Sequence, residues 1–106
     1  MPKYLISVNY TVKGMEGVRA AGAKARVDAV KAMLEPMGGT LESLHFAFGD
    51  TDVFCIVDAP DDEAVAAVGI AINGSGAASM RTTKLLTVEQ VDEALGRSVN
   101  YQPPGS

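Results

Sequence analysis

Three segments in which apolar and polar residues alternate constrain the fold of this chain more than any other feature of its sequence. They cover residues 3–10, 40–48 and 52–58, and alternation with a period of two predicts β-strands that have one buried face. The last two segments are separated only by Gly49-Asp50-Thr51, a stretch typical of a hairpin turn with glycine at a position that favours positive φ. The chain is therefore expected to contain a central antiparallel hairpin, with a fourth strand at residues 78–86.

Helical periodicity occupies the segments between these strands. Residues 18–37 predict one helix after a loop at residues 11–17, because apolar residues recur there at three- and four-residue steps and Gly38-Gly39 follows. A second helix is expected to begin at the acidic stretch 59–63, which suits the positive end of a helix dipole. Thr87-Val88-Glu89-Gln90 has the pattern of a capping box and predicts a third, short helix that ends near residue 95.

The order strand, helix, strand, strand, helix, strand, helix predicts an α+β fold of the ferredoxin-like βαββαβ type. Its four-stranded antiparallel sheet would be covered by the two main helices on one face, and a short C-terminal helix would follow. A chain of 106 residues fits a single domain. We expect this domain to span residues 1–95 and residues 96–106 to form a flexible C-terminal tail, because this segment has no periodicity.

Composition excludes several classes of partner. No apolar run approaches the roughly 20 residues of a membrane span, and the start does not resemble a signal peptide, so we expect a cytoplasmic protein without a membrane partner. The net charge is −4 and no cluster of Lys and Arg is present, which argues against nucleic-acid binding. Cys55 is the only cysteine and lies in an apolar strand, which predicts a buried thiol. One cysteine and one histidine do not predict a metal site within one chain.

The two faces of the predicted sheet differ in polarity. The more apolar face, assigned to the core, contains Tyr4, Ile6, Val8, Leu44, Phe46, Val53, Cys55 and Val57. The open face contains Leu5, Ser7, Asn9, Ser43, His45, Asp52, Phe54 and Ile56, and alternation also places Leu41 on the side of Ser43. This face is too apolar to be left in water as one patch and too polar for a dry core. We therefore predict a homo-oligomer formed through the open sheet face, with a polar pocket between subunits.

His45 and Asp52 are the candidate catalytic residues. His45 is the only histidine, and its imidazole is suited to a general base or to ligation of a metal or haem. Asp52 follows the hairpin on the same face and is suited to orienting that ring. The structural alternatives are a histidine bonded at a subunit interface and a carboxylate that caps the turn by accepting backbone amides.

Four further residues are candidates for ligand binding together with His45 and Asp52. Ser7 and Asn9 provide polar groups from the first strand, and Phe54 provides an aromatic wall. Arg81 begins the last strand and is suited to a bidentate contact with a carboxylate, although an ion pair between subunits fits it equally well.

Several stretches resemble the GYD domain family. These are residues 3–11, 38–39, 48–53, 59–64 and 81–87, and the motif that names the family reads Gly49-Asp50-Thr51-Asp52 here, with Thr51 where the family often has Tyr. The resemblance covers roughly residues 3–95. It implies a dimeric α/β-barrel form of the ferredoxin-like fold, and it implies no particular reaction. Similar barrels include small monooxygenases, haem proteins and isomerases, so the fold does not identify the function.

Two classes of function remain open at the level of sequence. The first is a non-catalytic assembly or regulatory module that binds a small molecule between sheet faces. The second is a small α/β-barrel enzyme, of the cofactor-independent monooxygenase or isomerase type, that uses His45 and Asp52. A haem or metal binder that uses His45 remains as a separate, third possibility. No residue pattern identifies a cofactor or a substrate.

Overall fold

The computed structural model describes residues 1–105, and four strands and four α-helices form within them. The strands are β1 (Lys3–Tyr10), β2 (Thr40–Phe46), β3 (Val53–Asp58) and β4 (Ala78–Leu85). The helices are α1 (Val12–Ala21), α2 (Ala23–Leu34), α3 (Asp62–Asn73) and α4 (Val88–Leu95), and a 3-10 turn, η1 (Glu35–Met37), follows α2. Within the described residues no helix has the length and apolar character needed to cross a membrane.

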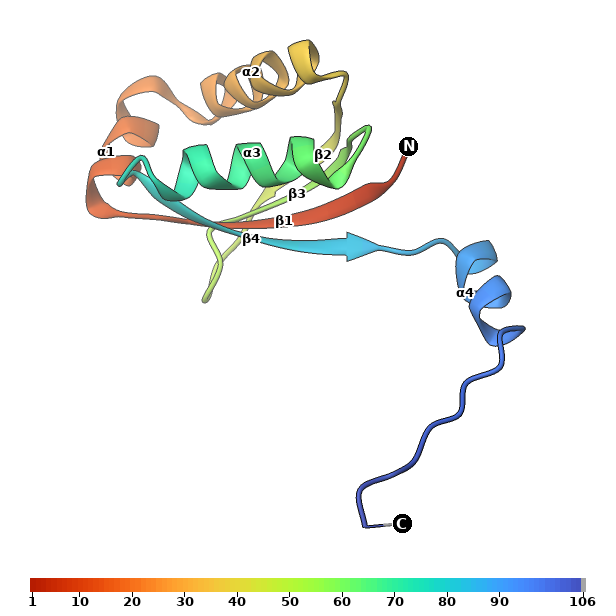
Figure 1. Cartoon of the computed structure of the whole chain (residues 1–106). Coiled ribbons are helices and arrows are strands. Elements are labelled where there is room, and N and C mark those ends of the chain that lie inside the picture. Colours follow the sequence, from red (N-terminus) through yellow and green to blue (C-terminus); the bar gives the residue numbers. More distant parts are fainter. Residues whose placement is uncertain (106) are drawn as a thin grey trace.

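The four strands form one antiparallel sheet in the order β2-β3-β1-β4. Helices α1, α2 and α3 all lie on one face of this sheet, as Figure 1 shows. This arrangement confirms the predicted ferredoxin-like α+β fold. Because all three helices lie on the same side, the other face of the sheet is not covered by helices α1 to α3 of this chain.

The segment predicted as one helix over residues 18–37 is two helices, and the predicted loop at residues 11–17 is most of the first. The Thr11 hydroxyl accepts a hydrogen bond from the Gly14 amide at 3.2 Å, so α1 begins directly after the first strand. Gly22, with φ at 93°, then separates α1 from α2. Glycine at position 14 suggested a loop, but α1 requires it: a Cβ there would lie 1.9 Å from the Ala77 carbonyl oxygen.

The end of the second helix follows the expectation from its glycines. Pro36 lies in the 3-10 turn η1 rather than inside α2, so its missing backbone donor interrupts no α-helical hydrogen bond. Gly38 adopts the left-handed conformation, with φ at 79°, and its amide donates to the Glu35 carbonyl. The chain thereby turns back towards the sheet and enters β2 at Thr40.

A β-bulge in β2 corrects the predicted position of Leu41. The register shifts between Leu41, which lies opposite Val57, and Ser43, which lies opposite Ile56. Glu42 is therefore an extra residue, and side chains before it point to the opposite face from the one that simple alternation predicts. Leu41 consequently packs against the core on the helix side, whereas Ser43 and His45 remain on the open face.

The core lies between the sheet and the helices, as predicted. Its buried members are Tyr4, Ile6, Leu34, Val53, Cys55, Val57, Ala59, Val65 and Met80. Val8 and Leu44 are partly buried against it. Phe46 was expected in the core and is instead 44% exposed, because it ends an edge strand that has a neighbouring strand on one side only. Burial raises the pKa of the Cys55 thiol, in agreement with its predicted role as a small apolar side chain.

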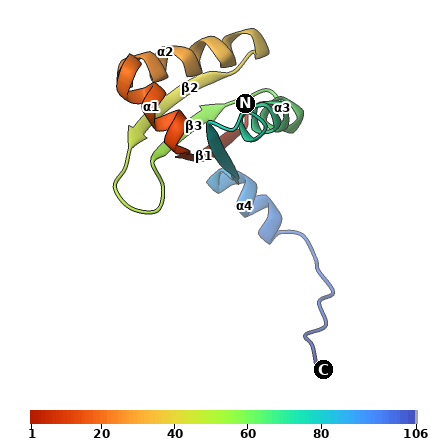
Figure 2. The same ribbon diagram turned by 90° about the vertical axis from the view of Figure 1, so that its left-hand side faces the viewer.

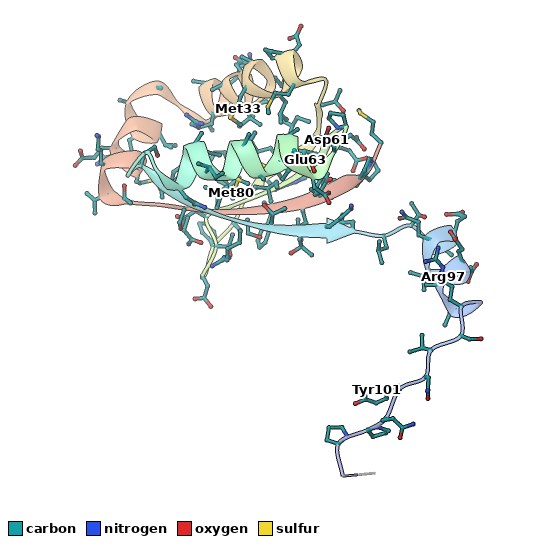
Figure 3. The ribbon with its side chains drawn as sticks, viewed as in Figure 1. Met33, Asp61, Glu63, Met80, Arg97 and Tyr101 are labelled. Atoms are coloured by element: carbon teal, nitrogen blue, oxygen red, sulfur yellow. The ribbon has the colours of Figure 1, made fainter. Side chains whose placement is uncertain are left out.

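Helix α4 and the segment after it extend away from the sheet (Figures 1 and 2). Thr87 and Gln90 form the predicted capping box, but no residue of α4 is buried. The radius of gyration is 17.1 Å, against about 13 Å for a compact chain of this length. Figure 3 shows Arg97 and Tyr101 on this projecting part of the chain. The division into residues 1–95 and a flexible tail stays a prediction, and Ser106 lies outside the described residues.

Candidate functional site

Four of the predicted site residues lie in one row that crosses the sheet on its open face. Strand pairing places His45 of β2 opposite Phe54 of β3. Ser7 of β1 pairs with Phe54 on one side and with Arg81 of β4 on the other. Since paired strands lie about 4.8 Å apart, the row spans roughly 15 Å. The sheet therefore aligns an imidazole, an aromatic ring, a hydroxyl and a guanidinium along a single line.

Arg81 and Asn9 form a polar cluster with the β2–β3 loop. The Arg81 guanidinium donates hydrogen bonds to the Asn9 side-chain oxygen at 3.3 Å and to the Thr51 hydroxyl at 3.0 Å. The Asn9 amide nitrogen donates to the Asp50 carbonyl at 2.5 Å. We call these four residues the Arg81 cluster. Both acceptors of Arg81 are neutral, and the guanidinium forms no ion pair with Asp50 or with any other carboxylate in residues 1–105.

The structure does not bring His45 and Asp52 together through a hydrogen bond. The Asp52 carboxylate accepts from the Tyr10 backbone amide at 2.9 Å, and the Asp52 amide donates to the Val8 carbonyl at 3.0 Å. Asp52 therefore holds the β2–β3 loop against the end of β1. His45 is exposed, and no side-chain hydrogen bond joins it to another residue within positions 1–105.

An ionic cluster occupies the opposite end of the open face. The Lys3 ammonium donates to the Glu42 carboxylate at 2.6 Å and to the Asp58 carboxylate at 2.9 Å. These two hydrogen bonds raise the pKa of Lys3. With one cation and two carboxylates, this end of the face has a net negative charge, whereas the other end contains the Arg81 guanidinium together with Asp50 and Asp52.

Apolar side chains lie between the two polar ends of the face. Leu5 pairs with Ile56 in the middle of the sheet, and both are partly exposed. Phe54 is 38% exposed, and Phe48 in the β2–β3 loop is fully exposed. The loop and α4 both project to the side of the sheet away from α1 and α2 (Figures 1 and 2). The open face is therefore an apolar surface with projections at two of its borders.

Thr51 is a side-chain partner of Arg81 that was not among the residues expected at the site. It is thirty positions from Arg81 along the chain, and only the pairing of β1 with both β3 and β4 brings the two side chains within 3.0 Å. The Gly49–Asp52 motif predicted a turn at Thr51, but it did not predict that Thr51 would contact Arg81.

The donor groups that bind metals are dispersed. Within residues 1–105 no three or more His, Cys, Asp or Glu side chains are grouped so that they could hold a metal ion. Cys55 is 4% exposed and lies on the helix side of the sheet, whereas His45 lies on the open side. The one thiol and the one imidazole of this chain are therefore separated by the sheet itself.

Comparison with known proteins supports the resemblance seen in the sequence. The match to the GYD domain family extends over residues 4–95, from the second residue of β1 to the end of α4. A search of curated proteins finds no match. The matched range includes β2, β3, β4 and all of β1 except Lys3, together with the Gly49–Asp52 loop and the Arg81 cluster. On this evidence the chain belongs to the GYD domain family.

Proposed function

We propose that this GYD protein is a homo-oligomeric assembly or regulatory module whose subunits pack together through their open sheet faces. The observation that carries the proposal is the open face itself, on which Phe54, Leu5 and Ile56 form an apolar centre between two polar ends. A continuous apolar surface of this kind on a small domain is typical of an interaction site.

The charge distribution of the face favours a second copy of the same chain as the partner. The end near Lys3, Glu42 and Asp58 is negative, and the opposite end contains the Arg81 guanidinium, which forms no ion pair within the described residues. A two-fold axis that runs across the strands reverses the strand direction of the second sheet, so each Arg81 guanidinium lies over the negative end of the other subunit. Both subunits then use the same surface, as closed dimers do.

The projecting parts of the chain fit this arrangement. The β2–β3 loop and α4 extend beyond the sheet on the side where the second subunit would lie (Figures 1 and 2). The loop contains the fully exposed Phe48, and α4 contains several exposed apolar residues. An isolated helix of the length of α4 is marginal in water. Val88, Val91 and Leu95 on α4 are exposed in the single chain, and contact with a second subunit would bury them.

The oligomeric state of two matched variants tests the proposal. Phe54→Lys places a charge in the centre of the face without creating a core cavity, because Phe54 is already 38% exposed. Ile70→Lys makes a similar change on α3, on the other side of the sheet, where Ile70 is 76% exposed. Light scattering coupled to gel filtration should find an oligomer for the wild type and Ile70→Lys, and a monomer near 11.0 kDa for Phe54→Lys. A wild-type monomer would refute the proposal.

A small molecule held between the faces is the regulatory part of the proposal. Arg81, with only neutral acceptors, supports a preference for an anionic ligand, and Ser7 and Asn9 supply further polar contacts. Native mass spectrometry of the intact oligomer would report a retained molecule at a fixed ratio per subunit. We expect the Arg81→Gln variant to remain an oligomer and to lose the retained molecule. If this variant still retains the molecule, Arg81 does not bind it.

The alternative, a small barrel enzyme that uses His45 and Asp52, has less geometric support. The Asp52 carboxylate is occupied by the Tyr10 amide rather than by the imidazole. His45→Ala separates the two functions. Dissociation of the oligomer would assign His45 to the interface, whereas an intact oligomer that no longer retains a ligand would favour a site built around the imidazole.

A further inference from the structure

A second hollow lies on the other side of the sheet, between its helix-covered face and the helices. It has a volume of about 490 Å³, within the range of small-molecule sites. Its walls come from α1, α2 and the end of α3, and its floor is the sheet. Small residues explain why side chains do not fill it. Gly17, Ala21, Ala25, Ala29 and Ala71 line it from the three helices.

The inner end of the hollow is apolar and adjustable. It shares Val30, Met33 and Cys55 with a smaller, wholly apolar cavity of about 60 Å³ that continues towards α3. Met33 on α2 and Met80 on β4 line this extension, and Figure 3 labels both. Methionine side chains are flexible and adapt to the shape of a ligand. The inner end is thus suited to an apolar group.

The outer part of the hollow contains the guanidinium of Arg26, which lies beside the Tyr10 hydroxyl and forms no ion pair within residues 1–105. Arg26 lines it, and its Nε atom is buried without a hydrogen-bond partner in the part of the chain that the structure describes. Lys13 is the other charged residue of the lining, and no Asp or Glu belongs to it. A buried donor on a charged group without a partner is unfavourable. The hollow therefore has an excess of positive charge that nothing in its lining balances.

Tyr10 adds a hydroxyl beside Arg26. Burial raises the pKa of Tyr10, and the nearby Arg26 guanidinium acts in the opposite direction. The phenol is protonated at neutral pH and remains a hydrogen-bond donor. One side of the hollow therefore presents a guanidinium and a hydroxyl, both of which can donate to the same acceptor.

We propose that this hollow binds a small organic carboxylate with an apolar body. The carboxylate accepts hydrogen bonds from Arg26 and from the Tyr10 hydroxyl, and the apolar body occupies the space near Val30, Met33 and Cys55. The site lies on the opposite side of the sheet from the Arg81 cluster, so it is independent of the proposed subunit interface. An alcohol with the same apolar body as the carboxylate would make the apolar contacts but not the charge-assisted hydrogen bonds.

Calorimetric titration of the full-length protein with decanoate and with decanol tests this site. The wild type should bind decanoate at one molecule per chain and more tightly than decanol. Arg26→Met keeps most of the side-chain volume and removes the charge. It should weaken decanoate binding by roughly 10- to 100-fold and leave decanol binding unchanged. Arg19→Met is the matched control, because Arg19 is an exposed arginine of α1 that does not line the hollow.

A second variant locates the bound molecule. Gly17 lines the hollow and a Cβ there would meet no atom within 4 Å, so Gly17→Phe should fill the space without disturbing the fold. It should abolish binding of both decanoate and decanol while circular dichroism remains that of the wild type. Bound decanoate should also slow the reaction of Cys55 with a thiol reagent.

Three results would overturn the proposal. The first is the absence of saturable decanoate binding to the wild type. The second is an equal loss of decanoate affinity in Arg26→Met and Arg19→Met, which would indicate a general charge effect. The third is unchanged binding in a folded Gly17→Phe variant, which would place the ligand outside the hollow.

Discussion

The hydroxyl of Tyr4 donates a hydrogen bond of 2.5 Å to the carboxylate of Asp62, and this bond joins the first strand to the start of α3. Lys84 of β4 forms an ion pair with the same carboxylate at 3.0 Å. Tyr4 itself is 2% exposed. A buried phenol, a helix terminus and an edge strand are therefore held together by one carboxylate on the helix-covered side of the sheet.

This bond predicts a specific loss of stability at alkaline pH. The hydrogen bond to Asp62 raises the pKa of Tyr4 from 10.0 to about 12. Because the folded state holds this proton more tightly, the contribution is complete below pH 10 and is lost as pH rises towards 12. Between pH 10 and pH 12 the melting temperature of the wild type should fall more steeply with pH than that of Tyr4→Phe. Tyr101→Phe, at an exposed position, should follow the wild type, and parallel curves for all three proteins would contradict the prediction.

The same bond predicts an effect at acid pH. The Tyr4 hydroxyl, followed by Lys84, lowers the pKa of Asp62 below its ordinary value of 3.8. The stabilising contribution of Asp62 is therefore present above that value and is lost as the pH falls through the lower pKa of the folded state. Asp62→Asn should reduce the dependence of the melting temperature on pH in this acidic range. An unchanged dependence would show that Asp62 titrates alike in the folded and unfolded states.

Shortening a core side chain where α2 packs against the sheet should lower the free energy of unfolding. Leu34 is 6% exposed and belongs to the buried cluster. Leu34→Ala should lower the free energy of unfolding by about 2–5 kcal/mol, because it removes apolar contacts and leaves a cavity. Ile70→Ala, at a position that is 76% exposed, should change it by less than about 0.5 kcal/mol. Urea unfolding measures both values, and a similar small effect of both variants would contradict the assignment of Leu34 to the core.

Two glycines of α1 should respond in opposite ways to the same substitution. A Cβ at position 14 would lie 1.9 Å from the Ala77 carbonyl oxygen, so Gly14→Ala must displace α1 or the loop before β4. Gly17→Ala meets no atom within 4 Å and should raise the free energy of unfolding by about 0.5–1 kcal/mol, because alanine favours the helix. Melting temperatures of the two variants should move in opposite directions. Stabilisation by Gly14→Ala would contradict the close approach of α1 to Ala77.

The single thiol should react slowly in the native protein. Cys55 is 4% exposed, and burial raises the pKa of its thiol, so little thiolate is available to a reagent. Labelling with a chromogenic disulfide should be complete at once in denaturant and much slower in buffer. Equally fast labelling in both conditions would show that the strand containing Cys55 opens readily.

Much of the fold could be predicted from local patterns. Alternation located β1 and the hairpin, acidic residues located the start of α3, and the Thr87 capping box located α4. Each of these signals acts within a few residues. The errors came from features that depend on distant contacts. Gly14 suggested a loop until the position of Ala77 was known. Leu41 was placed on the wrong face because an extra residue in β2 leaves no local signal in the sequence.

The candidate sites divide in the same way. The sequence by itself determined which residues are chemically suited to a site, including His45, Asn9 and Arg81, because residue type and strand alternation are local properties. Arg26 also falls on the apolar stripe of its helix, four positions before Val30, which is a signal that a sequence analysis could use. Only the tertiary structure decided that Arg81 reaches Thr51, that Asp52 binds the Tyr10 amide and that Arg26 borders a hollow. The physical reason is that these relationships depend on which strands pair and how closely helices approach the sheet, and both are set by packing between segments far apart in the chain.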